Sequence, residues 1–386
     1  MKVIISCCGK FHAFHLAEQL DKLGCLHKLI TPYYSQKDKW LLNVREDKEK
    51  INTGRVVTNV ALAILHKIFS KFSGLNYYYL QNFDDWAKKQ IDECDLFVGW
   101  SGYSLDSLQK AKSIGAVTVL ERCSSHILFQ KEILEEEYNK YDIGVEPVDE
   151  QVAQKELDEY KEADFISIPS TFVWKTFIEK GIKKEKLIHV PYGVDLSSFK
   201  KMPKEDNVFR IVFIGGLTLR KGVHYLLEAY SQLKLKNTEL LLIGGLSSEF
   251  KPFLKRYEGN YRYVGIIPHL ELYKYLSQGS VFVLPSIEEG LAYVIPQAMA
   301  GGLPVICTTN TGGGDIVQDS IDGFVIPIRN VEKLKEKIVF FYKNQDACRE
   351  MGESAQKRVS SGFTWDDYGE KIINVYKNLI KNSNVN

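Results

Sequence analysis

Residues 281–306 read VFVLPSIEEGLAYVIPQAMAGGLPVI, and this stretch decides the fold. The apolar run at its start has the length and composition of a buried strand, which Pro285 closes. Residues 292–299 have the composition of a helix, with Pro296 as an interruption near its first turns, and a second apolar run follows. A strand, a helix and another strand in this order predict a parallel sheet that is covered on both faces.

The same alternation extends along most of the chain of 386 residues. Helical spacing separates apolar runs that we interpret as parallel strands. In the first half these runs are residues 2–8, 27–32, 94–100, 116–121, 164–170 and 187–193, and in the second half they are residues 209–216, 239–245, 261–267, 281–286, 303–309 and 322–328.

The composition of the chain changes at FKKMPKEDNV (199–208), which is polar, rich in lysine and contains a proline. This stretch predicts a linker between two doubly wound α/β domains, residues 1–200 and residues 201–362. The remaining residues, 363–386, have an amphipathic helical pattern. Two such domains joined by one linker enclose a cleft, and ligands of open α/β sheets bind at the carboxyl ends of the strands.

Composition excludes several classes of protein. Hydrophobic residues make up 45% and charged residues 26%, and the net charge of +1 gives no general attraction to nucleic acid. The seven cysteines are scattered and form no CxxC pair, which favours a reducing, cytoplasmic compartment over a disulfide framework. No apolar run approaches the roughly 18 residues of a membrane span. The first apolar run stops at Gly9 and Lys10, so we interpret it as a strand and not as a signal peptide.

GGLTLRKG (215–222) follows an apolar strand and precedes a helix. Arg220 and Lys221 at a helix start oppose the helix dipole unless an anion lies between them and the helix. Arginine supplies a planar fork for phosphate oxygens and lysine a point charge. The stretch therefore predicts a site for a di- or triphosphate, and a solvated turn is the alternative.

The loop after Pro285 carries a second candidate site. Gly290 would let the backbone approach a ligand closely, with the amides of Leu291 and Ala292 directed at it. Glu289 and Gln297 are eight residues apart, or roughly 12 Å along a helix, so one could reach a sugar and the other a ribose. The alternative for Glu289 is an acid that stabilises a helix N-terminus.

The motifs of the second half together resemble the nucleotide-sugar-binding domain of glycosyltransferase family four, which comprises retaining enzymes of the GT-B fold. The resemblance covers about residues 187–376 and is carried by LIHVPYGVDLSSF (187–199), IGGLTLRKGVHYLLEA (214–229), YVGIIPHLELYKYLSQGSVFVLPS (263–286), EEGLAYVIPQAMAGGLPVI (288–306) and TGGGDIV with IDGFVIPI (311–328). The first half matches more loosely, through EADFISIPSTFVWKTFIEKGI (162–182) and LERCSSH (120–126). It is similar to a bacterial subset with an Arg-x-Ser-Ser-His pattern.

The resemblance implies a GT-B fold of two Rossmann-like domains that face a cleft, with the C-terminal helix crossing back to the first domain. It also implies roles for individual residues. Lys221 would bind the donor diphosphate, Glu289 the donor sugar, and His126 the sugar near the reaction centre. With Arg220, these form the expected catalytic set, and the expected donor-binding set is Gly9, Gly216, Ile266, Gly290, Leu291, Ala292 and Gln297.

Two positions depart from the family pattern. The usual arginine after the strand is Gly216 here, and we infer that Arg220 supplies its charge. The second acid of the Glu–seven residues–Glu motif is Gln297. An amide accepts from one ribose hydroxyl and donates to the other, whereas a carboxylate accepts from both, so we expect nucleotide binding to persist in weakened form.

No cofactor or metal is expected. His12 and His15 are three residues apart at a helix start, but a third ligand is not evident, and the chain contains no Asp-x-Asp. The first strand is not followed by GxGxxG, which argues against a nicotinamide enzyme, and GxSxG is also missing.

VVTNVALAILHKIFSKF (56–72) combines apolar residues with His66, Lys67 and Lys71. Such a stretch could lie on an anionic membrane surface, which would place the protein peripherally on the cytoplasmic face of the inner membrane. A helix packed on the first domain is the alternative.

The resemblance implies an enzyme of the hexosyltransferase type. It would transfer a sugar from a nucleoside diphosphate sugar to a glycan or lipid-linked acceptor, with retention, in cell-surface polysaccharide or glycolipid biosynthesis. The leaving phosphate oxygen would take the acceptor's proton, so no side-chain base is required. Two alternatives stay open: a GT-B epimerase that uses His126 and Glu121, and a catalytically silent nucleotide-sugar-binding protein, which Gly216 and Gln297 motivate.

Overall fold

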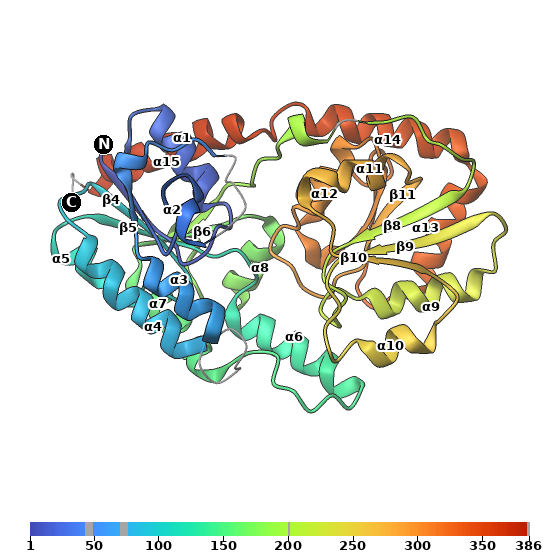
Figure 1. The fold of residues 1–386 in the computed structure, drawn as a ribbon, viewed down its shortest axis with the longest axis horizontal. Coiled ribbons are helices and arrows are strands. Elements are labelled where there is room, and N and C mark those ends of the chain that lie inside the picture. The colour runs from blue at the N-terminus through green and yellow to red at the C-terminus, as the bar shows by residue number, and fades with distance from the viewer. Residues whose placement is uncertain (43–48, 70–75, 200, 384–386) are drawn as a thin grey trace.

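Each half of the chain forms its own parallel sheet (Figure 1). The computed structural model describes residues 1–42, 49–69, 76–199 and 201–383. Within them, the sheet of the first half has the order β3-β2-β1-β4-β5-β6-β7, which reverses between β1 and β4 as in a doubly wound sheet. Its strands are Val3–Ser6 (β1), Leu26–Thr31 (β2), Val56–Thr58 (β3), Leu96–Trp100 (β4), Val117–Glu121 (β5), Phe165–Ile168 (β6) and Leu187–His189 (β7).

The sheet of the second half has the order β10-β9-β8-β11-β12-β13 and reverses between β8 and β11. Its central strands are buried along their whole length, as expected for strands that helices cover on both faces. The strands are Phe209–Ile214 (β8), Thr238–Ile243 (β9), Arg262–Gly265 (β10), Val281–Leu284 (β11), Val305–Thr308 (β12) and Gly323–Ile326 (β13).

Helices connect the strands, so the alternation read from the sequence is confirmed in both halves. In the first half they are Ala13–Lys22 (α1), Ser35–Leu42 (α2), Val60–Phe69 (α3), Asn76–Ala87 (α4), Leu105–Ser113 (α5), Ile127–Lys140 (α6), Glu150–Glu162 (α7) and Thr171–Glu179 (α8). In the second half they are Val223–Leu233 (α9), Lys251–Arg256 (α10), Leu272–Ser277 (α11), Val294–Ala300 (α12), Val331–Lys343 (α13) and Gln345–Val359 (α14), and Trp365–Ser383 (α15) ends the described chain.

The helix of the opening stretch begins later than the sequence suggests. α12 starts at Val294 and not at Ala292, which places Pro296 in its first turn. The first four N–H groups of a helix have no partner within the helix, so the missing N–H of proline costs nothing there. Pro296 therefore does not interrupt this helix.

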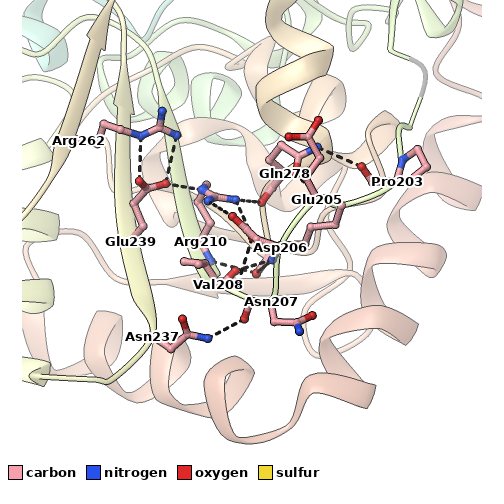
Figure 2. A network of polar contacts seen from close by, with 12 residues as sticks. Pro203, Glu205, Asp206, Asn207, Val208, Arg210, Asn237, Glu239, Arg262 and Gln278 are labelled. Atoms are coloured by element: carbon pink, nitrogen blue, oxygen red, sulfur yellow. Dashed lines mark hydrogen bonds and ion pairs between the residues drawn. The ribbon is translucent and has the colours of Figure 1, made fainter.

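The linker is fastened to the second half by the polar network in Figure 2. Arg210 on β8 forms ion pairs with Asp206 of the linker, at 2.8 Å, and with Glu239 of β9. Gln278 donates to the carbonyl of Pro203 at 3.1 Å and accepts from the amide of Glu205 at 2.9 Å. The linker residues from 203 onward thus lie against the second half.

The last helix returns to the first half, beside α1 (Figure 1). Asp366 of α15 accepts a hydrogen bond from Gln19 at 2.9 Å and pairs with Lys22 at 3.2 Å. Gly369 lies so close to Gln19 that a Cβ there would be 2.7 Å from its side-chain oxygen. This helix joins the two halves on the side opposite α6.

The stretch 56–72 begins as a short edge strand, β3, before α3 packs against α4. Ile64 and Leu65 are exposed on α3, and Lys71 and the side chains of His66 and Lys67 lie outside the described residues. No helix among the described residues has both the length and the apolar character needed to cross a membrane.

Candidate functional site

Loops at the carboxyl ends of β5, β8 and β11 meet between the two halves. They border a cleft of about 570 Å³ to which both halves contribute. Its lining includes Trp100, Tyr103, Glu121, Arg122, Cys123 and Ser124 from the first half, and Thr218, Arg220, Glu289 and Gly290 from the second. The cleft therefore lies at the switch points of two doubly wound sheets, where ligands of such sheets bind.

The structure brings together Arg220, Lys221 and Glu289, as the sequence predicts. Nη1 of Arg220 lies 3.1 Å from Oε1 of Glu289, and Lys221 forms an ion pair with the same oxygen. The negative charge of Glu289 is the main cause that raises the pKa of Arg220. Gly222 follows with a φ of 64°, and a Cβ there would lie 2.0 Å from the carbonyl oxygen of Pro285. Only glycine permits this contact, which holds the β8 loop against the β11 loop.

Glu288, the other member of the acidic pair, joins the two halves. Its Oε1 accepts hydrogen bonds from the Ser124 hydroxyl at 2.6 Å, and from the Ser125 hydroxyl and amide at 2.7 and 3.0 Å. Its Oε2 lies 3.2 Å from Nη1 of Arg220. Burial raises the pKa of Glu288, but Arg220 and the serine donors outweigh it, so the pKa lies below its ordinary value. No role for Glu288 was evident from the sequence.

His126 is not among the residues that line the cleft. Its ring is 2% exposed, and its Nδ1 accepts the amide of Leu128 at 3.2 Å, which caps α6. The ring packs against Tyr160 and Phe177 at centroid distances of 5.0 and 4.9 Å. Burial, followed by the nearby charge of Arg122, lowers the pKa of His126 from 6.5 to about 4. In the Arg-x-Ser-Ser-His motif, the serines face the other half and the histidine faces the core of its own half.

Gly290 is required by a contact between the two halves. A Cβ at this position would lie 1.9 Å from the carbonyl oxygen of Cys123. The amide of Ala292 already donates to the carbonyl of Thr311 at 3.1 Å, and Leu291 and Ala292 are buried. The Ala292 amide therefore already has a hydrogen-bond acceptor within the protein. The sequence instead led us to expect this amide to donate to a phosphate.

Gln297 lies in a second cavity, of about 480 Å³. Its Nε2 is 2.9 Å from Nε2 of His269. Phe11 lines this cavity as well as the cleft, so the two spaces adjoin at this side chain. A ligand that extends from Glu289 to Gln297 would pass it.

Five expected donor-binding residues lie outside the lining of both spaces, and two of them are the buried Leu291 and Ala292. Gly9 adjoins Phe11, whose ring a Cβ at Gly9 would meet at 2.7 Å. Ile266 is 81% exposed, and Gly216 is half-buried. Their roles stay predictions.

His12 and His15 turn to different partners. Nε2 of His12 is 3.1 Å from Glu121, and Nε2 of His15 is 3.2 Å from Glu49. His15 stacks on Trp365 at 3.9 Å. No group of three potential metal ligands occurs in the part of the chain that the structure describes.

The second half matches a known family. Residues 195–358 match the family described as "Glycosyl transferases group 1". The putative colanic acid biosynthesis glycosyltransferase WcaL of Escherichia coli is 25% identical over 225 residues, which are 54% of this chain and 54% of WcaL. The capsular polysaccharide biosynthesis glycosyltransferase CapM of Staphylococcus aureus is 26% identical over 242 residues, which are 57% of this chain and 63% of CapM. The chain thus spans between about half and two thirds of the length of these relatives.

Solved structures match over nearly the whole chain. Sucrose-phosphate synthase of Thermosynechococcus elongatus superposes with a TM-score of 0.71 at 19% identity and covers 99% of both chains. HepE of Anabaena, in complex with UDP and glucose, superposes with a TM-score of 0.70 at 14% identity, over 98% of this chain and 100% of HepE. The two parallel-sheet domains of this chain therefore have the GT-B fold, which confirms the expected fold class.

Proposed function

We propose that this protein is a glycosyltransferase that moves a sugar from a nucleoside diphosphate sugar to a glycan or lipid-linked acceptor, with retention at the anomeric carbon. The observation that carries the proposal is the meeting of Arg220, Lys221 and Glu289 at a cleft lined by both domains of a GT-B fold. The match of the second half to glycosyl transferases group 1 supports the same reaction class.

The geometry suggests how the second half would stabilise the leaving group. Departure of a nucleoside diphosphate builds negative charge on its phosphates, and positive groups fixed beforehand lower the barrier for that step. Arg220 and Lys221 are held in place by Glu289 before any ligand arrives. A diphosphate would take over these cations, which frees the Glu289 carboxylate to accept hydrogen bonds from the donor sugar. The phosphate oxygen on the same face would receive the acceptor's proton, so no metal or side-chain base takes part.

The names of WcaL and CapM place those relatives in the biosynthesis of cell-surface polysaccharides. We extend this role to the present chain, with a glycan or a lipid-linked glycan as acceptor in the cytoplasm. A lipid-linked acceptor would bring the protein to the membrane surface. The exposed Ile64, Leu65 and Tyr78 on α3 and α4 support a peripheral contact there.

The experiment is an assay with labelled nucleotide sugars and an extract of lipid-linked and free glycans. Transfer of label, in the presence of excess EDTA as well as without it, is the expected result. Lys221→Ala should reduce this transfer. Its control is Lys274→Ala, which removes an exposed cation from α11. Formation of an epimer, or binding without turnover, would instead select one of the two alternatives, and loss of transfer that added metal restores would refute a metal-free reaction.

A further inference from the structure

A cysteine, a histidine and a carboxylate form one chain of contacts beside the cleft. Sγ of Cys123 lies 3.8 Å from Nδ1 of His12, and Nε2 of the same ring lies 3.1 Å from Oε2 of Glu121. Cys123 is partly exposed and lines the cleft, whereas His12 and Glu121 are each 1% exposed. A nucleophilic thiol is activated by a base within reach, which a third group orients.

Glu121 is well placed to keep a proton on His12. Its second oxygen, Oε1, is buried and has no hydrogen-bond partner among the described residues, so the His12 contact is the one that its carboxylate makes there. Burial by itself lowers the pKa of His12, but the contacts with Cys123 and Glu121 outweigh it and raise this pKa to about 9. A more basic imidazole within reach of a thiol, held in place by a carboxylate, is the arrangement that draws the proton from a cysteine nucleophile.

The other ionisable groups near this cluster are neutral or paired elsewhere. Tyr192 lies 4.1 Å and Tyr368 6.3 Å from the His12 ring, and burial raises the pKa of both phenols well above the ordinary value. Burial lowers the pKa of His15 to about 4. Arg122, next to Cys123 in the chain, is paired with Glu156 at 2.9 Å. Burial also raises the pKa of the remaining neighbouring groups, which are Cys7, Tyr103, Tyr293 and Tyr376.

Cys123 differs from the remaining cysteines, all of which the structure describes. Burial raises the pKa of five of them, to about 12 for Cys8, Cys94, Cys307 and Cys348 and well above the ordinary value for Cys7. These five are protonated at neutral pH. Cys25 is partly exposed, and its thiol donates to the carbonyl of Leu23 at 3.5 Å, so it provides an internal reference of similar access.

We propose that Cys123 is a reactive thiol, and that the cleft holds a modification site for hydroperoxides and other soft electrophiles. The thiolate sulfur attacks one oxygen of the hydroperoxide and the O–O bond breaks. The leaving alkoxide or hydroxide takes the proton of His12 and departs as alcohol or water. The sulfur loses two electrons and becomes a sulfenic acid, and the hydroperoxide gains them. This inference does not depend on the proposed sugar transfer.

The test is a short pulse of iodoacetamide on the folded, reduced protein, followed by peptide mapping of the seven cysteines. At neutral pH, Cys123 should be alkylated at least about tenfold faster than Cys25. Hydrogen peroxide with dimedone should then label Cys123 as a sulfenic acid. A Cys123 rate no higher than that of Cys25, or no dimedone adduct, would overturn the proposal.

His12→Gln removes the imidazole base and keeps a polar side chain of similar size. Alkylation of Cys123 should slow about tenfold in this variant, while Cys25 reacts as before. Circular dichroism and the melting temperature check its fold. An unchanged Cys123 rate in a folded variant would refute the role of His12, and if the variant does not fold, the ratio of the Cys123 and Cys25 rates in the wild-type protein decides.

Discussion

Single residues in the cleft are arranged as compensated charges. Arg220 contacts both Glu288 and Glu289, whereas the recorded ion pair of Lys221 is with Glu289. Arg220 is therefore linked, through Glu288, to the contact between the two halves, whereas Lys221 forms no ion pair with Glu288. A ligand that replaced Glu289 would leave Arg220 anchored through Glu288, because this second contact does not involve the oxygen that the ligand displaces.

Arg220→Ala and Lys221→Ala should each lower turnover by at least about tenfold, because removing one preorganised positive group costs on the order of 2–4 kcal/mol in the transition state. Steady-state kinetics with Lys274→Ala as control would measure this. The melting temperature should fall more for Arg220→Ala, since the buried Glu288 then loses its cation. Unchanged kinetics in either variant would remove that residue from the site.

Gln297→Glu should tighten the binding of a nucleoside diphosphate by about 1 kcal/mol, since hydrogen bonds to a charged group are stronger than neutral ones and desolvation offsets part of the gain. Gln297→Ala should weaken binding. Because the ribose does not change during the reaction, the effect should appear in KM and not in kcat. If calorimetry finds that both variants bind the nucleoside diphosphate as tightly as the wild-type protein, Gln297 is not a ribose ligand. The motif must then be aligned differently.

At the scale of elements, α6 begins on a histidine cap whose charge state matters for stability. The pKa of His126 is lowered to about 4, so the folded state stays neutral while the unfolded chain takes up a proton below 6.5. Stability is fully present above this pH and falls by up to about 3 kcal/mol as the pH drops towards 4. His126→Asn retains an acceptor for the Leu128 amide but cannot titrate.

Unfolding in urea at a series of pH values checks this expectation. The variant should be less stable at neutral pH, because the ring contacts with Tyr160 and Phe177 are lost, but its stability should vary less between about pH 6.5 and 4. The pKa of His15 is also lowered to about 4, so His15 contributes to the pH dependence of the free energy of unfolding in both proteins. An equal pH dependence would contradict the role of His126, and a large loss of turnover would instead support the contact with the sugar that the resemblance implies.

The elements were predictable where local pattern determines them, and the site only in part. Apolar runs such as 209–216 and 281–286 predict their strands because a strand buried on both faces needs little besides apolar side chains. β3 has three residues at a sheet edge and leaves too short a pattern to detect. Glu288 gave no signal because its partners lie 163 and 164 residues away in the sequence. A histidine that follows a strand looks the same in sequence whether it faces a cleft or caps a helix, as His126 does.

Across the whole molecule, two buried carboxylates join the halves in opposite directions. Glu288 reaches from the second half to Ser124 and Ser125 of the first. Glu137 on α6 reaches from the first half to the second, where it accepts from His224 at 2.9 Å, from Tyr225 at 2.8 Å and from Arg329 at 2.6 Å. Figure 1 shows α6 extending from the first half towards α9 and α10. Each carboxylate has cationic or hydroxyl donors, so each can be buried as an anion.

Substitutions of these two residues can test the contact between the two halves separately from the sugar transfer. Glu288→Gln and Glu137→Gln preserve size and remove the charge, and each should cost about 1–3 kcal/mol in the free energy of unfolding, since a hydrogen bond to a charged group becomes neutral. Glu288→Gln should also raise the KM for the donor, because its partners Arg220 and Ser124 line the cleft. The partners of Glu137 are not among the lining residues, so Glu137→Gln should leave KM and kcat unchanged. Denaturant unfolding and steady-state kinetics on both variants give the answer. If both alter KM alike, the docking of the two halves as a whole sets donor affinity, and if neither does, Glu288 holds the halves together without positioning Arg220.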